Sequence, residues 1–311
     1  MHDSLQHNPG TTAKSAAERN ARTALVLGGG GSAGNAWLIG VLAGLLDSGV
    51  AATEADLVIG TSAGSTAAAQ TSTTRPTELL ASILAEAPPM RTGPAGTDRG
   101  RAPIAPAANH LETTNAIIAA ARDAADMRRR MGAAALQDAA SDDSGTARWR
   151  AIVSTRLPDP RWPEQRVLIT AVDARTGEPV VFDRDSGVDL VDAVAASTSS
   201  RFAYGIGGNR YIDGGYRRNE NADLAAGYER VLVLSPLGGR TRMPLEWAMQ
   251  LAAQVDELRA HGSRVETILP DADSLAAFGD NLMDPSTRPP AARAGYNQGR
   301  ARAEQLTAFW S

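Results

Sequence analysis

Two short apolar runs near the start of the chain each end abruptly in a glycine-rich turn. The first run, Thr23–Leu27, leads into four consecutive glycines, and the second, Asp56–Ile59, leads into Gly60-Thr-Ser-Ala-Gly64. Between the two runs, residues 35–46 carry apolar side chains at helical spacing. A buried strand, a helix and a second buried strand form a βαβ unit, which places the strands in a parallel sheet covered by helices. The sequence therefore predicts an α/β fold.

Strand and helix signals continue along the rest of the chain. Further strands are predicted at residues 167–172, 180–182, 211–212, 230–235 and 265–269, and further helices at 188–196, 244–264 and 291–310. This alternation predicts a single α/β domain over residues 22–311, built on a mostly parallel central sheet flanked by helices. A polar, disordered leader is expected over residues 1–21.

Residues 86–150 differ from the rest of the chain in composition. Prolines and glycines come first, and an alanine-rich helical pattern follows over residues 111–140. We interpret the segment as a helical cap inserted into the domain, whose alanine, isoleucine and leucine side chains would line a pocket over the site. Arg128–Arg130 lies within it and indicates either a solvated helix face, balanced by nearby aspartates, or a transient contact with a membrane surface.

Composition argues against several classes of function. The chain has no cysteine and only four histidines, two of them in the first seven residues, so we expect neither thiol chemistry nor a metal or other cofactor. A net charge of -4 gives no electrostatic reason to expect nucleic acid as a partner. No apolar run approaches the roughly 20 residues of a membrane-spanning helix, and no secretory signal is evident, so a cytoplasmic location is expected, with peripheral contact at membranes left open.

The sequence Gly60-x-Ser62-x-Gly64, between a strand and a helix, is typical of a nucleophile elbow. Glycines on both sides of the serine would let the chain turn sharply and expose the hydroxyl at the end of the strand. A serine must pass its proton to a base as it attacks, and the tetrahedral intermediate that forms needs N–H donors for its oxyanion. Ser62 is therefore a candidate nucleophile that requires two partners.

Gly29, Gly30 and Gly31 are the predicted oxyanion donors. They leave a strand at the same sheet edge as the serine, and the helix that follows presents the positive end of its dipole. The spacing Gly29-x-Gly31-x-x-Gly34 also fits the dinucleotide-binding fingerprint, so a Rossmann-type nucleotide-binding protein is an alternative. That fingerprint expects an acidic residue at the end of the next strand, whereas Asp56 opens it.

Asp213 is the leading candidate for the base. It follows a short apolar run and precedes Gly214 and Gly215, which would allow a close approach to the serine. Burial would raise its pKa from about 4 towards a useful value at neutral pH. An Asp-Gly hairpin turn is the structural alternative. A third interpretation is a Ser-Asp-His triad completed by His261, which occurs in the chain order of α/β-hydrolases but also lies where a histidine could cap a helix.

Together, three motifs in this order resemble the signature motifs of patatin-like phospholipases: Gly29-Gly-Gly-x-x-Gly34, Gly60-Thr-Ser-Ala-Gly64 and Asp213-Gly-Gly215. The resemblance extends from residue 23 to at least residue 236. It implies a three-layer α/β/α fold and a lipid acyl hydrolase that cleaves fatty-acyl esters through an acyl-enzyme intermediate. It also implies a dyad of Ser62 and Asp213, an oxyanion hole at Gly29 to Gly31, no cofactor, and a lipid or other acyl ester as partner.

The sequence departs from this family in two places. Many members carry a basic residue two positions after the glycine triplet, where this chain has Ala33. Many also have a proline before the catalytic aspartate, which is absent from the segment Ala196–Arg201. The first change removes a charge beside the oxyanion loop, and the second would loosen the approach to Asp213. Neither removes a group that the chemistry requires, and the sequence sets no oligomeric state.

Overall fold

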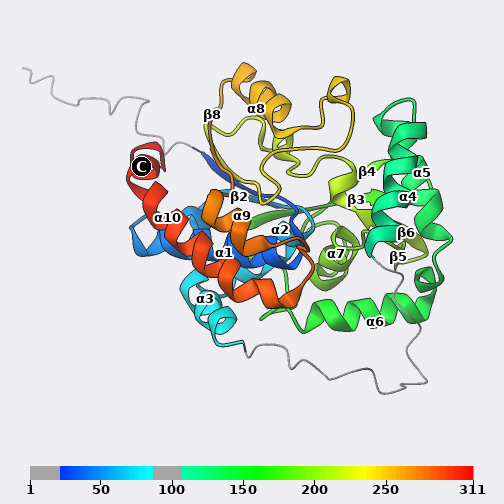
Figure 1. The fold of residues 1–311 in the computed structure, drawn as a ribbon, viewed down its shortest axis with the longest axis horizontal. Helices are drawn as coiled ribbons and strands as arrows, with labels where there is room; N and C mark the ends of the chain where they lie inside the picture. Colours follow the sequence, from blue (N-terminus) through cyan, green and yellow to red (C-terminus); the bar gives the residue numbers. More distant parts are fainter. Residues whose placement is uncertain (1–21, 87–106, 311) are drawn as a thin grey trace, which may run out of the picture.

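The computed structural model describes residues 22–86 and 107–310, and these residues form an eight-stranded sheet with helices on both faces (Figure 1). The strand order is β5-β6-β3-β2-β1-β7-β8, and β4 pairs with β3 off this path. The strands are β1 (Thr23–Leu27), β2 (Leu57–Gly60), β3 (Arg166–Asp173), β4 (Pro179–Phe182), β5 (Tyr204–Ile206), β6 (Asn209–Asp213), β7 (Arg230–Leu234) and β8 (Arg264–Ile268). The predicted leader, residues 1–21, lies outside the described residues.

Most of the sheet is parallel, as predicted. Strands β3, β2, β1, β7 and β8 pair in parallel with one another in this order, whereas β4 and β6 pair antiparallel with β3, and β5 pairs antiparallel with β6. Strand β1 is central, and its Leu25 is level with Val58 of β2 and Leu232 of β7. Strands β5 and β6 are joined by Gly207 and Gly208, which both have positive φ angles, as in a tight hairpin.

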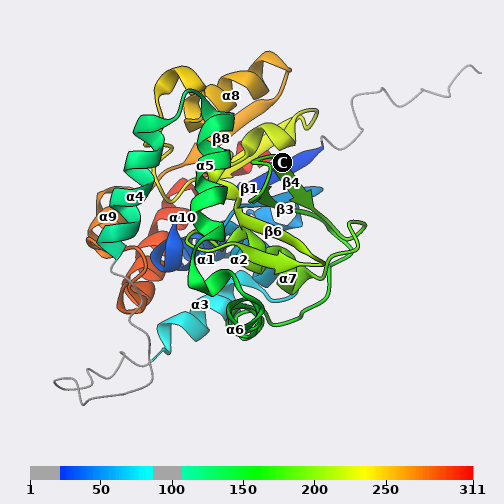
Figure 2. The ribbon, with the colours of Figure 1, turned by 90° about the vertical axis from the view of Figure 1, so that its right-hand side faces the viewer.

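Helices connect the strands and cover the sheet. They are α1 (Gly31–Asp47), α2 (Ala63–Thr71), α3 (Pro76–Leu84), α4 (Ala107–Ala120), α5 (Ala124–Leu136), α6 (Asp143–Ser154), α7 (Leu190–Ser197), α8 (Leu251–Ala260), α9 (Ala272–Phe278) and α10 (Arg288–Trp310). Figure 2 shows α4 and α5 side by side, with α6 below them. Within the described ranges, no helix has both the length and the apolar character needed to cross a bilayer.

The sheet separates two layers of hydrophobic core. Leu25 and Leu27 of β1 belong to the core shared with α1 and α10, whereas Ala24 and Val26 belong to the core shared with α8. Burial on both faces explains why these strands read as continuous apolar runs instead of alternating ones. The α/β/α arrangement predicted for the fold is thereby confirmed.

Two predicted helical segments differ from those observed. The alanine-rich stretch 111–140, for which one or two helices are expected, contains two, but the first begins earlier, at Ala107, and Asp123 caps the second by accepting a hydrogen bond from the Asp126 backbone N–H at 2.7 Å. The helix expected over 244–264 extends only from Leu251 to Ala260. Ala248 has a positive φ of 51° before it, and Gly262, with a φ of 89°, turns the chain into β8 after it. Residues 87–106 of the predicted cap lie outside the described residues.

Candidate active site

Ser62 lies in the turn between β2 and α2, at the carboxyl end of the parallel strands. Its φ of 54° and ψ of -118° form a strained conformation for a residue other than glycine. The turn is held by its neighbours, because the Ser62 backbone N–H donates to Ser197 Oγ at 2.9 Å and Ser65 Oγ donates to the Ser62 carbonyl at 2.6 Å. A strained turn of this kind is the geometry of a nucleophile elbow.

The glycines that flank Ser62 are required for close packing. Neither Gly60 nor Gly64 has a positive φ angle. A Cβ atom on Gly64 would overlap the carbonyl of Leu27, and one on Gly60 would lie 2.6 Å from the Cα of Ser65. The expectation that the glycines themselves make the sharp turn is therefore revised: Ser62 takes the strain, and the glycines let α2 approach β1 and its own strand.

Asp213 ends β6 and faces the serine. Strand β6 pairs with β3 so that Asp213 is level with Ala171. The residue is 7% exposed, and its Oδ1 accepts a hydrogen bond from the Gly215 N–H at 2.8 Å. Ser62 lines the same cavity as Asp213, and its hydroxyl is close enough to the carboxyl group to lower the pKa of Asp213. The structure thus brings together the two residues that the sequence predicts as nucleophile and base.

The environment of Asp213 changes its acidity. Burial raises the pKa of Asp213 to about 6, although the hydrogen bond from Gly215 and the nearby Ser62 hydroxyl act in the opposite direction. A carboxylate with this pKa is mostly ionised at neutral pH and is a better proton acceptor than an ordinary aspartate. Burial and the nearby Asp213 charge raise the pKa of Tyr216, whose hydroxyl donates to the Ser200 carbonyl at 2.6 Å. Tyr216 therefore stays neutral beside the pair.

The glycine loop passes directly against the elbow. A Cβ atom on Gly29 would lie 3.4 Å from the Cβ of Ser62. The Gly29 N–H donates to the Asn219 carbonyl at 3.1 Å, so this amide is already engaged. The amides of Gly30 and Gly31 have no acceptor within residues 22–86 and 107–310. Of the three predicted oxyanion donors, Gly30 and Gly31, where α1 begins, therefore have free amides among the described residues, and the role itself stays a prediction.

A buried polar cluster beneath the pair was missed at the level of sequence. Thr61 Oγ1 and Thr170 Oγ1 are 2.9 Å apart, and Asn221 Nδ2 donates to them at 3.0 and 3.2 Å. Asn221 Nδ2 also lies 3.3 Å from the carbonyl of Gly214. The cluster connects the strand that carries the elbow to the turn after Asp213. The available signal was Thr170, a polar residue within the apolar run 167–172.

The segment before Asp213 holds both members of the pair, although it lacks the expected proline. Ser197 Oγ accepts the hydrogen bond from the Ser62 N–H described above. The Ser199 carbonyl accepts one from the Asp213 N–H at 2.9 Å. The approach to Asp213 is therefore tethered by hydrogen bonds from this segment, and the expectation that it would be loose is wrong.

The other departure from the family pattern is Ala33, which stands where many members carry a basic residue. Ala33 is fully buried, and its N–H donates to the Leu282 carbonyl at 2.9 Å. An arginine from a distant part of the chain lies beside the same turn. Arg288, the first residue of α10, donates from Nη1 to Asn35 Oδ1 at 3.2 Å and to the Ser32 carbonyl at 3.4 Å. Positive charge near the glycine loop thus comes from α10.

Ser62 and Asp213 line one cavity of about 670 Å³. Its apolar wall consists of Leu79, Ile83, Trp149, Met283 and Pro285. Of the predicted cap, residues 86–150, only Glu86 and Trp149 line the cavity among the described residues. The apolar surface therefore comes mainly from α3 and from the segment before α10, and not from the alanine-rich helices.

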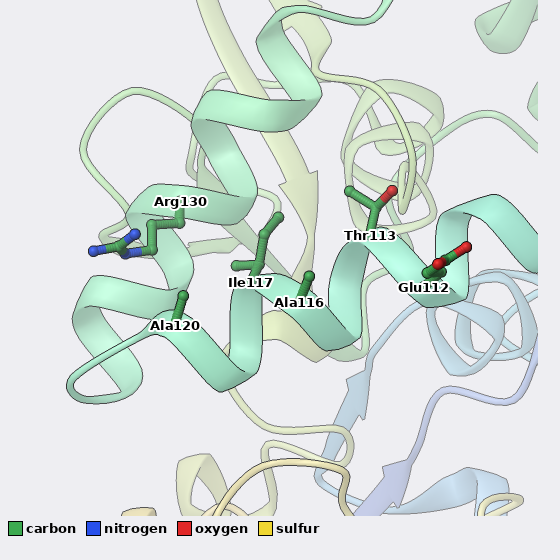
Figure 3. Close-up of a pocket in the computed structure, with 6 residues that line it drawn as sticks. All are labelled: Glu112, Thr113, Ala116, Ile117, Ala120 and Arg130. Atoms are coloured by element: carbon green, nitrogen blue, oxygen red, sulfur yellow. The ribbon is translucent and has the colours of Figure 1, made fainter.

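A separate depression lies on α4 and α5 (Figure 3). It is lined by Glu112, Thr113, Ala116, Ile117, Ala120 and Arg130, so it shares no residue with the cavity that contains Ser62.

The basic run Arg128–Arg130 on α5 has partners within the chain. Arg130 and Arg129 pair with Asp126 at 3.1 and 3.6 Å, and Arg128 Nε donates to the Gly177 carbonyl at 2.7 Å. These contacts favour the helix-face interpretation of the basic run, and a membrane contact stays a prediction.

The alternative site residues lie at the opposite end of the strands. His261 follows α8, and its Nδ1 is 2.6 Å from the Glu257 carbonyl, as in a helix-capping histidine. Three residues later β8 begins at Arg264, which is level with Arg230 at the start of β7. Ser62 follows the end of its strand, so the structure does not bring His261 to the pair.

Asp56 also lies at the opposite end of the strands from the glycine loop. Its Oδ2 accepts a hydrogen bond from the Thr23 N–H at 2.7 Å, at the start of β1 and β2. A dinucleotide fingerprint needs its acidic residue at the other end of the strand, where the loop would hold the phosphates. The expected arrangement for nucleotide binding is therefore absent at this position.

The family model of patatin-like phospholipases matches residues 25–226. Among solved structures, VipD from Legionella pneumophila is similar with a TM-score of 0.42 and 12% identity, over 92% of this chain and 67% of VipD. The type III effector protein ExoU is similar with a TM-score of 0.38 and 16% identity, over 92% of this chain and 53% of ExoU. The chain thus spans about half of ExoU. No curated protein sequence matches.

Proposed function

The chain belongs to the patatin-like phospholipase family, which makes it a lipid acyl hydrolase, and on this premise we propose that Ser62 is its nucleophile and Asp213 its base. One observation carries the proposal. Ser62, on a strained turn, lines the same cavity as the buried Asp213 carboxyl group, whose pKa is raised to about 6 by burial in spite of the opposing effect of the Ser62 hydroxyl. This arrangement supports nucleophilic catalysis by a Ser-Asp dyad without a histidine.

In the first half of the reaction, Ser62 Oγ attacks the carbonyl carbon of the ester. Its proton passes to the Asp213 carboxylate, and the carbonyl oxygen becomes an oxyanion. When the tetrahedral intermediate collapses, the bond to the alcohol breaks and protonated Asp213 returns the proton to the leaving oxygen. The products of this half are the free alcohol and an acyl group bound to Ser62.

In the second half, water replaces the alcohol. Asp213, again a carboxylate, accepts a proton from the water while the water oxygen attacks the acyl carbonyl carbon. Collapse of the second intermediate breaks the bond to Ser62 Oγ, which takes the proton back from Asp213. The fatty acid leaves, and both residues return to their starting state.

The oxyanion would be held by backbone amides. Those of Gly30 and Gly31 are free within the described residues and lie at the positive end of the α1 dipole. The Ala63 amide, which follows the nucleophile, is also without an acceptor in those ranges. In nucleophile elbows this amide is commonly one of the oxyanion donors.

The cap is a further part of the proposal. We infer that residues 86–150 form an insertion into a single domain, in which Glu86 and Trp149 border the cavity among the described residues. The packing of α5 against β3 and β6, through Met131, Val172 and Ile212, supports the attachment of the described part of the segment to the domain.

The proposed nucleophile can be tested by labelling with a fluorophosphonate probe and mapping the modified residue by mass spectrometry. We expect a single modified serine, Ser62, in the wild-type protein and no labelling of Ser62→Ala. Ser65→Ala is a matched control on the same turn. Its hydroxyl bonds the Ser62 carbonyl, so labelling should slow without moving to another residue. Modification of any other serine in the wild type would contradict the assignment.

A further inference from the structure

Glu220 is a buried acidic residue that the dyad mechanism does not use. It is only 1% exposed, and its carboxyl group forms no ion pair within residues 22–86 and 107–310. Burying a carboxylate is costly unless hydrogen bonds or an opposite charge compensate it, so stability alone gives little reason for an acidic side chain at this position. The groups that bond Glu220 indicate what it does instead.

Three neutral donors converge on the Glu220 carboxylate. Its Oε1 accepts hydrogen bonds from Asn219 Nδ2 at 2.9 Å and from Ser235 Oγ at 2.6 Å. Its Oε2 accepts one from Gln254 Nε2 at 3.1 Å. These donors lie in the loop after β6, directly after β7, and on α8, respectively. Glu220 thus connects three segments that are separate in the sequence.

Neighbouring contacts set the orientation of two of these donors. Gln254 Oε1 accepts a hydrogen bond from the Ala222 N–H at 2.8 Å, so the amide nitrogen of Gln254 is the end that faces Glu220. Ser235 Oγ accepts one from the Gly239 N–H at 2.9 Å, so its own proton is free for the carboxylate. Amide nitrogens only donate, so the group between them must accept on both of its oxygens. A carboxylate does this, and the amide of a glutamine does not.

The start of the glycine loop lies against Glu220 and Asn219. A Cβ atom on Gly28 would be 3.3 Å from Glu220 Cγ. One on Gly29 would be 2.7 Å from Asn219 Oδ1. The Gly29 N–H donates to the Asn219 carbonyl at 3.1 Å, and Asn219 Nδ2 is 3.4 Å from the Gly29 carbonyl. The hydrogen bond from Asn219 to Glu220 therefore fixes the side chain on which Gly29 rests.

The end of the loop packs on the segment after β7. A Cβ atom on Gly30 would be 2.5 Å from the Cβ of Pro236, which follows Ser235. Gly30 and Gly31 carry the two loop amides that have no acceptor in the described ranges. The position of these amides thus depends on the segment that Ser235 attaches to Glu220.

We propose that Glu220 is a positioning residue for the oxyanion hole. Its carboxylate holds Asn219 and Ser235 in place, and their segments hold the loop whose free amides stabilise the charge that forms on the substrate carbonyl. An oxyanion donor must lie about 3 Å from that oxygen, so a small displacement of the loop weakens binding of the transition state more than binding of the substrate. The inference rests on the proposed acyl hydrolase function and adds to it a residue that does not line the cavity.

The main test is Glu220→Gln, which keeps the shape of the side chain and replaces one accepting oxygen by a donating amide. With p-nitrophenyl hexanoate, we expect kcat to fall about tenfold, less than the roughly 10²-fold loss that follows removal of a whole oxyanion donor. KM should change little, because the weakened interaction forms only in the transition state. Rates are referred to the concentration of active sites, titrated with a fluorophosphonate, so that misfolded protein does not affect the result.

Binding of a transition-state analogue separates positioning from a purely structural role. Hexyl trifluoromethyl ketone accepts Ser62 Oγ at its carbonyl carbon, the serine proton passes to Asp213, and the carbonyl oxygen becomes an oxyanion. In Glu220→Gln, its inhibition constant should rise about tenfold, in parallel with the fall of kcat. Hexyl methyl ketone, whose carbonyl carbon stays trigonal, should bind equally to the variant and the wild type.

Two further variants complete the experiment. Ser235→Ala removes one donor from the carboxylate and should give a smaller change of the same kind, about threefold, which keeps the proposal testable if Glu220→Gln does not fold. Glu266→Gln is the matched control, because the partners of this glutamate of β8 are Gln305 and Arg302 of α10. It should leave kcat and the inhibition constant unchanged.

Two results would overturn the proposal. The first is an unchanged kcat and an unchanged inhibition constant in Glu220→Gln. The second is a lower kcat with an unchanged inhibition constant, since the loss would then lie outside the oxyanion hole. A wild-type protein that neither cleaved p-nitrophenyl hexanoate nor reacted with a fluorophosphonate would instead contradict the acyl hydrolase function on which the inference rests.

Discussion

The parallel and antiparallel halves of the sheet contribute differently to the candidate site. Ser62 and the loop Gly28–Gly31 follow the neighbouring parallel strands β2 and β1, so both arrive at the same edge as in any parallel sheet. Asp213 ends β6, which runs antiparallel to β3 with Asp213 level with Ala171. A shift of one residue in this register would turn the carboxylate to the other face. The position of the proposed nucleophile follows from a general rule of parallel sheets, whereas the position of the proposed base depends on one specific strand pairing.

Strand β3 lies between these halves and joins them. Thr170 bonds Thr61 on the parallel side, and Asn221 bonds both threonines. On the antiparallel side, a Cβ atom on Gly214 would overlap Thr170 Oγ1, so the turn after Asp213 packs directly on this hydroxyl. The two halves of the sheet therefore differ in how they position the site. A short sequence motif is enough to form the turn of the proposed nucleophile, Ser62, whereas the proposed base, Asp213, is positioned by buried contacts between β2, β3 and the turn after β6.

Replacement of Asp213 tests whether the antiparallel half supplies the base, and it has the largest expected effect. In Asp213→Asn, the amide cannot accept the Ser62 proton, so we expect kcat/KM for a p-nitrophenyl ester to fall about 10³-fold. Asp173→Asn is a control on the same strand pair, since Asp173 accepts hydrogen bonds from the turn amides of Arg175 and Thr176. If His261→Ala were inactive and Asp213→Asn remained active, the antiparallel half would not supply the base, and the triad with His261 would be favoured over the dyad.

The pH dependence of kcat/KM tests the burial of the base. The pKa of Asp213 is raised to about 6, and only the ionised form can accept a proton, so activity should fall as the pH drops through 6. We expect kcat/KM to be about tenfold lower at pH 5 than on the plateau above pH 7. The residual rate of Asp213→Asn should lack this midpoint. Persistence of the midpoint in that variant would mean that another group titrates.

Replacement of Thr170 tests the connection between the halves and has the smallest expected effect. Thr170→Val keeps the shape of the side chain but leaves the buried Asn221 amide with one partner fewer. We expect the free energy of unfolding in urea to fall by about 1–3 kcal/mol. A displaced Asp213 should also shift the pH midpoint of kcat/KM, which a purely structural role would not do. Thr71→Val, on a hydroxyl bonded within α2, is the control. An unchanged midpoint would remove Thr170 from the positioning of the base.

The sequence was informative wherever local chain chemistry decides the structure. The strand–glycine loop–helix pattern at Thr23–Asp47 and the elbow at Gly60–Gly64 predict the observed elements, because apolar runs, helical spacing and glycine turns act over a few residues. Asp213 was also predicted as the partner of Ser62, and the structure brings these residues together. Its catalytic role, like that of Ser62, stays a proposal until the variants are measured.

Features that depend on distant contacts were not predictable in the same way. The Gly29 amide is engaged by Asn219, which is 190 positions away, so no local pattern could exclude it as a donor. The positive φ lies at Ser62 and not at Gly60 or Gly64, and Gly64 packs against the Leu27 carbonyl of β1, a contact between segments that local sequence does not reveal. The helix predicted over residues 244–264 is wrong at both ends because Ala248 and Gly262 take positive φ angles.

The sequence by itself determined that this chain is an α/β protein with Ser62 on a turn between a strand and a helix and a glycine loop beside it, and it predicted Asp213 as the partner of Ser62. These are properties of short segments, in which steric limits and hydrophobic periodicity dominate. Only the tertiary structure decided which amides are free, what holds the aspartate at the serine, and that Glu220 connects the segments on which the glycine loop rests. Burial, which raises the pKa of Asp213, arises when segments far apart in the chain meet, so it is set by the packing of the whole domain.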